Sequence, residues 1–168
     1  MLDIDEKKAE YWLKKAEGSP RGQRAFGLFQ EGYNCSQAVV AAYADVYDLD
    51  INLALRMAAS FGGGIGRMRL TCGTVSGMCI LAGLENGSTV EGDTEGKGRN
   101  YELVQLLAHQ FEKEAGSITC AELLGLKPMT PITTKPEERT PEYYKKRPCV
   151  ETVALACRIY GEYLNSKE

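Results

Sequence analysis

Apolar residues recur every three to four positions along most of the chain, which is the spacing of one face of an α-helix. The clearest case is the segment 100–115. Its Leu103, Leu107 and Phe111 share one face. The same spacing predicts helices over 4–17, 19–32, 34–46, 52–60, 71–84, 141–146 and 148–165, and one or two turns over 119–125. No segment alternates as a half-buried strand does, so the pattern predicts an all-α bundle of about six to eight helices.

Two kinds of segment interrupt this helical pattern. Eleven of the 18 glycines lie between positions 62 and 98, which predicts Gly-rich loops over 61–69 and 85–98. The segment 127–141 holds four of the six prolines and has no apolar period. We expect it to form an extended Pro-rich arm on the surface. The length of 168 residues suits one domain, with its core in 19–165.

Composition and charge exclude several classes of function. The net charge is −3 and the pI is about 5.4, whereas nucleic-acid binding requires clustered Lys and Arg, so we expect no nucleic-acid partner. The longest uncharged run, 70–84, has only 15 residues and contains three glycines, which is too short and too polar to cross a bilayer. The N-terminal residues are charged, unlike a signal peptide. We therefore expect no membrane insertion and a cytoplasmic location.

The six cysteines are unexpected, because a chain of this length buries enough surface to fold without disulfides. Four of them directly follow a residue that starts a predicted helix: Cys35 after Asn34, Cys72 after Thr71, Cys120 after Thr119 and Cys149 after Pro148. We refer to these four as the helix-start cysteines. Free N–H groups and the helix dipole at such positions favour negative charge and lower the pKa of a thiol. A simple tolerance for small residues at helix starts is the alternative explanation.

Residues near these cysteines add two further signals, one electrostatic and one for a helix start. Arg67, Arg69 and Arg147 lie close in sequence to helix-start cysteines and would further stabilise thiolates. Thr119 and Glu122 have the spacing of a capping box.

The other two cysteines, Cys79 and Cys157, lie two turns deeper in their helices among apolar residues. We interpret them as core residues; the alternative is that they resolve a disulfide formed at a helix end. No C-x-x-C motif is present, which excludes zinc ribbons, thioredoxin-type motifs and haem attachment of the c type. Four thiolates brought together could hold zinc or an iron–sulfur cluster, or could form two disulfides.

The glycines near Cys72 have two interpretations. Gly62, Gly63 and Gly64 do not have the spacing of a nucleotide-binding loop, since Arg67 stands where the third fingerprint glycine should be. They form either a flexible helix connection or a set of backbone N–H groups that face an anionic centre. Gly73 and Gly77, four residues apart, leave one helix face without side chains. This face permits close helix packing or leaves room for a cofactor beside Cys72.

Five segments together resemble a known family. They are 32–39, 61–66, 72–77, 120–125 and 147–149. They resemble the redox-active protein family named for its C-GCAxxG-C-C pattern, over about residues 20–165. The resemblance implies a small helical protein whose pattern cysteines are the four helix-start cysteines. Thr74 stands where the motif usually has Ala. A related domain in split-Soret-type cytochromes carries an iron–sulfur cluster besides haem, and only the cluster could carry over to this chain.

These observations lead to one functional expectation with two alternatives. We expect Cys35, Cys72, Cys120 and Cys149 to ligate one iron–sulfur cluster of the [2Fe–2S] type, which exchanges electrons with a redox partner protein. We expect the five glycines described above, Gly62, Gly63, Gly64, Gly73 and Gly77, to give backbone N–H groups access to the sulfur atoms. The alternatives are metal-free thiol–disulfide chemistry and a helical binding module with structural zinc. The sequence leaves open whether the site lies within one chain or at a homodimer interface.

Overall fold

The computed structural model describes residues 19–168, and the helix predicted over 4–17 lies outside the described residues. The remaining chain forms eight α-helices: α2 (Pro20–Gln30), α3 (Cys35–Ala42), α4 (Ile51–Ala58), α5 (Gly73–Asn86), α6 (Thr94–Ala115), α7 (Cys120–Leu123), α8 (Pro141–Lys146) and α9 (Cys149–Asn165). Short 3₁₀ turns follow α3 (Ala44–Tyr47) and α4 (Ala59–Phe61). Residues 19–168 contain no strand, only one bridge between Thr71 and Thr119. The all-α prediction is confirmed.

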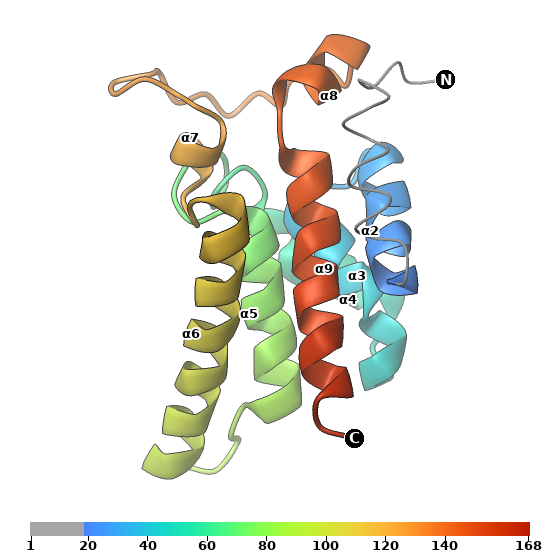
Figure 1. Ribbon diagram of the computed structural model, residues 1–168, viewed down its shortest axis with the longest axis vertical. Helices are drawn as coiled ribbons and strands as arrows, with labels where there is room; N and C mark the ends of the chain where they lie inside the picture. Colours follow the sequence, from blue (N-terminus) through green and yellow to red (C-terminus); the bar gives the residue numbers. More distant parts are fainter. Residues whose placement is uncertain (1–18) are drawn as a thin grey trace.

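The long helix α9 lies against α2, α3, α5 and α6. Figure 1 shows α5, α6 and α9 running side by side along the molecule, with α7 and α8 at one end. Helices α5 and α9 both begin at that end, whereas α6 runs back towards it. This arrangement places several helix starts close together, and the Pro-rich arm joins α7 to α8 beside them.

Tyrosine hydroxyls join the helices across the core. The buried Tyr43 donates to the carbonyl of Cys157 at 2.6 Å, and the buried Tyr160 donates to the carbonyl of Leu81 at 3.0 Å. The two rings meet edge to face, with centroids 5.0 Å apart. A buried hydroxyl needs such a partner because leaving it unpaired costs about 1–3 kcal/mol. These bonds connect α9 to the segment that ends α3 and to α5.

Side-chain caps set most helix starts, and two differ from the prediction. Helix α6 begins at Thr94, six residues before the predicted start, because Asp93 accepts a hydrogen bond from the N–H of Gly96 at 2.8 Å. The Gly-rich loop predicted over 85–98 is correspondingly shorter. Helix α4 is capped by Asp50, which accepts from Leu53 N–H at 2.9 Å, and not by Asn52. A good capping residue outweighs the low helix propensity of nearby glycines.

Other predicted features agree with the structure. Asn34 and Gln37 form the predicted capping box, and Ser19 caps α2 ahead of Pro20. Residues 126–140 contain no helix and are largely exposed, as expected for the Pro-rich arm. The helix predicted over 34–46 is correct in place, although it ends at Ala42 and continues as the 3₁₀ turn.

Two glycines of α5 give a matched test of its packing. A Cβ at Gly77 would lie 2.9 Å from Cβ of Val39, whereas a Cβ at Gly83 would meet nothing within 4 Å. We expect Gly77→Ala to lower the free energy of unfolding by about 1–2 kcal/mol, because overpacking exceeds the gain in helix propensity. Gly83→Ala should raise it by about 0.5–1 kcal/mol. Urea unfolding measures both, and a stabilised Gly77→Ala variant would contradict the close α3–α5 contact.

Candidate cysteine centre

The four helix-start cysteines line one cavity of about 290 Å³. Three of them are the first residues of their helices, since Cys35 begins α3, Cys120 begins α7 and Cys149 begins α9. Cys72 is the N-cap residue of α5. The structure thus brings together cysteines that are up to 114 residues apart in sequence. Cys79 and Cys157 do not line this cavity, and Cys157 is fully buried in the hydrophobic core.

Backbone pairing joins the start of α5 to the start of α7. The N–H of Cys72 donates to the carbonyl of Ile118 at 2.8 Å. The N–H of Cys120 donates to the carbonyl of Leu70 at 2.7 Å. These two bonds flank the bridge between Thr71 and Thr119 and hold the two cysteines side by side.

The predicted capping box between Thr119 and Glu122 is absent, because Thr119 is extended in this bridge and its side chain makes no cap hydrogen bond. The hydroxyl of Ser117 takes this role instead. It accepts from the N–H of Thr119 at 2.9 Å and donates to the carboxylate of Glu122.

Two glycines permit the close approaches that build the centre. Gly64 has φ +73°, and a Cβ there would lie 2.6 Å from Cβ of Cys120. A Cβ on Gly73 would lie only 2.4 Å from Sγ of Cys35, so glycine lets this sulfur rest against the first turn of α5. Both positions therefore exclude every residue with a side chain.

The remaining predicted glycines differ in their surroundings. Gly62 and Gly63 line the cavity, and a backbone hydrogen bond from Gly63 to Cys35 favours the thiolate form of that cysteine. This agrees with the interpretation of backbone N–H groups that face the sulfur atoms. Gly77 is not part of the cavity wall and packs against Val39. Close helix packing therefore accounts for Gly77.

Burial dominates the electrostatics of the thiols. It raises the pKa of Cys72 to about 12 and also raises the pKa of Cys35 and Cys149, and neighbouring cysteine thiolates raise all three further. The expectation that helix starts lower the pKa is therefore wrong for these three cysteines in the metal-free chain. Removing a thiolate from water costs more than the helix dipole returns. These three thiols are accordingly protonated and uncharged at neutral pH.

Several polar groups oppose this effect locally. The hydroxyl of Thr74 lies 3.1 Å from Sγ of Cys72, and Nη1 of Arg69 lies 3.9 Å from Sγ of Cys120. Arg147 lowers the pKa of Cys149 by its positive charge, although burial outweighs it. Thr74, the departure from the usual family motif, thus supplies a hydrogen bond to a cysteine sulfur.

The number and the chemistry of the four cysteine sulfur atoms fit a metal or cluster that is ligated by four thiolates. Four cysteines line one cavity, three of them buried and Cys149 partly buried, and hydrogen-bond donors or a guanidinium group contact the sulfur atoms of three of them. Within residues 19–168, no three His, Cys, Asp or Glu side chains are already arranged to hold a metal ion. Ligation would therefore require the cysteine side chains to turn towards a common point.

Charged residues from three segments surround the sulfur atoms. Arg67 and Arg69 come from the loop before α5, Arg147 precedes α9, and Glu137 comes from the Pro-rich arm. Glu137 forms ion pairs with all three arginines. The sequence marks the arginines by their closeness to cysteines. It gives no signal for Glu137, which lies in a segment without periodicity.

A comparison with known families agrees with this geometry. Residues 33–163 match the family described as "Putative redox-active protein (C_GCAxxG_C_C)". The chain belongs to this family. No curated protein and no solved structure was found to match it. Among the helices of residues 19–168, none combines the length and apolar character needed to cross a membrane.

Burial of the thiols predicts a loss of stability at alkaline pH. Since the pKa of Cys72 rises from 9.0 to about 12 on folding, the folded chain retains a proton there that the unfolded chain loses above about pH 9. This stabilisation is complete below about pH 9 and disappears as the pH rises towards 12.

We expect the reduced, metal-free protein to lose about 1–2 kcal/mol more than its Cys72→Ala variant between about pH 8 and about pH 10.5. Urea unfolding at the two pH values measures this difference. The two proteins differ at no other residue, so the comparison isolates one thiol. Equal losses would show that Cys72 titrates normally in the folded chain.

Proposed function

We propose that this protein transfers electrons through one iron–sulfur cluster of the [2Fe–2S] type, ligated by Cys35, Cys72, Cys120 and Cys149. The observation that carries the proposal is the convergence of four cysteine thiols, three buried and that of Cys149 partly buried, on one cavity. Four cysteine thiolates are the usual ligand set of such clusters. Membership of a family described as redox-active favours iron over a purely structural metal.

The protonated state of the buried thiols argues against the metal-free alternative. Thiol–disulfide exchange requires a thiolate nucleophile, and burial disfavours the thiolate of Cys35, Cys72 and Cys149. A bound cation reverses this balance, because its charge favours deprotonated sulfur. Structural zinc has the same ligand chemistry, and the experiment below separates it from iron.

The residues around the sulfur atoms have defined roles in this proposal. When bound, the cluster would accept and release single electrons. The backbone N–H of Gly63 and the hydroxyl of Thr74 donate to Cys35 and Cys72, and Arg69 places positive charge beside Cys120. Such donors stabilise negative charge on the ligands and thereby tune the reduction potential. A redox partner protein in the cytoplasm would exchange the electrons.

Metal analysis of the anaerobically purified protein tests the ligand set. We expect iron and acid-labile sulfide, with visible absorption that bleaches on reduction. Cys35→Ala and Cys149→Ala should each abolish all three signals, because each variant removes one of the four cysteine ligands that the cluster requires. Cys79→Ala, outside the cavity, should leave them unchanged.

Three results would contradict the proposal. Stoichiometric zinc without a redox response would indicate a structural site. A metal-free protein whose thiols oxidise reversibly would indicate disulfide chemistry. An equal loss of iron in Cys79→Ala would show that the division of the cysteines is wrong.

The contact between Arg69 and Cys120 predicts a change in reduction potential. Arg69→Gln removes a positive charge from the cavity wall, so adding an electron becomes less favourable and the potential should fall. Arg56→Gln on α4 removes the same charge from an exposed side chain that does not line the cavity. A spectroscopic redox titration compares them at equal iron content. A potential that is equal in both variants would exclude a specific effect of Arg69.

A further inference from the structure

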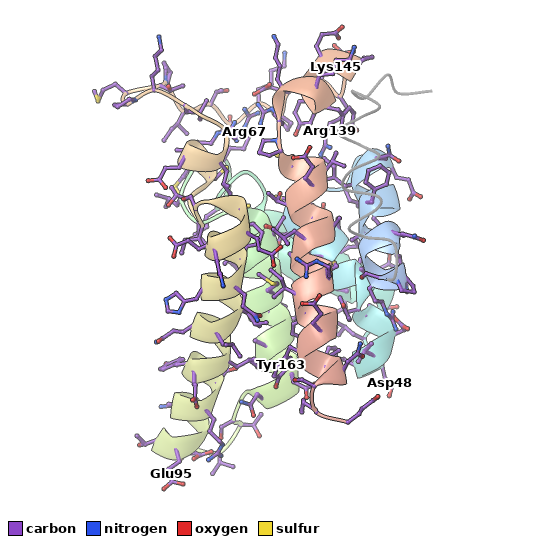
Figure 2. The ribbon with its side chains drawn as sticks, in the orientation of Figure 1. Asp48, Arg67, Glu95, Arg139, Lys145 and Tyr163 are labelled. Atoms are coloured by element: carbon purple, nitrogen blue, oxygen red, sulfur yellow. The ribbon has the colours of Figure 1, made fainter. Side chains whose placement is uncertain are left out.

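The cavity above the cysteines has an excess of positive charge. Four arginines line it, Arg67, Arg69, Arg139 and Arg147, together with a single carboxylate, Glu137. Figure 2 shows Arg67 and Arg139 at the same end of the bundle. Arg139 is already engaged, because it donates to the carbonyls of Phe29 and Tyr33 and lies over aromatic rings. The other three depend on Glu137 for their ion pairs.

One carboxylate does not satisfy three guanidinium groups. Glu137 contacts Arg147 closely, but its Oε1 lies 3.4 Å from Nη2 of Arg67 and 3.9 Å from Nη2 of Arg69. These three arginine side chains are only 14–15% exposed, whereas Glu137 is 50% exposed. Burying a charge is costly unless it is paired. The arginines therefore lie in the largely buried wall of the cavity, and their carboxylate partner reaches them from the exposed arm.

Arg67 shows most directly that a partner is missing. Its Nη1 donates to the carbonyl of Lys135 on the arm. Its Nε is buried and has no hydrogen-bond partner among residues 19–168. Buried donors without a partner are rare in folded proteins. An oxyanion in the cavity would supply acceptors for the guanidinium groups of Arg67 and Arg69, which both line it.

We propose that this cavity is a binding site for a small oxyanion, held by Arg67, Arg69 and Arg147 in competition with the carboxylate of Glu137. Guanidinium groups bind carboxylate, sulfate and phosphate oxygens in a matching planar geometry. The volume of about 290 Å³ leaves room for such an anion. In the structure the carboxylate of Glu137, from the Pro-rich arm, takes the place of this oxyanion beside the arginines. The inference goes beyond the proposed function, because it concerns the arginines of the cavity wall and not the cysteines.

Calorimetric titration with sulfate tests the site in the full-length protein as purified, with ionic strength held constant by chloride. Glu137→Gln removes the competing carboxylate and should tighten sulfate binding about tenfold, the equivalent of a charged hydrogen bond of about 1.4 kcal/mol. Glu138→Gln is the matched control. It removes the same charge from the next residue of the arm, which lies outside this cavity, and should leave the affinity unchanged. Arg67→Gln should weaken binding about tenfold or more.

Each other outcome would overturn the inference. Equal effects of Glu137→Gln and Glu138→Gln would show only an overall charge effect. Absence of binding in both the parent protein and Glu137→Gln would show that the arginines serve the cysteines alone. Iron and sulfide contents, measured on the same samples, report separately on the cluster, so sulfate binding without iron would support this site while contradicting the cluster.

Discussion

Backbone hydrogen bonds between the loop before α5 and the turn before α7 hold the centre of this protein together. Cys72 bonds to Ile118, Cys120 bonds to Leu70, and Ala121 bonds to Arg69. Helix α5 leads away from this junction and α6 returns to it (Figure 1), so residues 48 apart in sequence become neighbours. Without this pairing the start of α7 would have no fixed place beside α5. The pairing in turn requires Gly64, whose backbone passes against Cys120.

At the helix-start cysteines, the helix dipole favours the thiolate whereas burial disfavours it, and the magnitudes of the two effects can be compared for Cys72. A helix dipole favours an anion at its start by about 0.3–1 kcal/mol. A rise in the pKa of Cys72 from 9.0 to about 12 corresponds to about 4 kcal/mol against the thiolate. Burial therefore outweighs the helix dipole for Cys72 in the metal-free chain, and this thiol remains protonated at neutral pH. The same burial suits a bound cation, since low solvent exposure strengthens every interaction between the thiolates and a positive charge.

The cavity combines two kinds of chemistry. Sulfur atoms from four helix starts form one part of its wall, and arginines from three segments form another. The Pro-rich arm connects them, because Glu137 reaches the arginines and Lys135 accepts a bond from Arg67. The arm, although largely exposed, thus supplies the carboxylate that pairs with the arginines of the cavity. Its sequence has no helical or strand period, so its role is visible only in three dimensions.

The sequence by itself determined the helical class, most helix starts and the division of the cysteines into four and two. These features depend on local chemistry, namely the apolar period and residues such as Asn34 and Pro20 that stabilise a helix start. Even local rules failed where an unforeseen cap was available, as for Asp93 before α6. Only the tertiary structure decided that the four cysteines share a cavity, that Gly73 lies against Cys35 whereas Gly77 serves helix packing, and that Glu137 faces the arginines. It also reversed the expected pKa shift of Cys35, Cys72 and Cys149, because desolvation depends on burial by residues distant in the sequence.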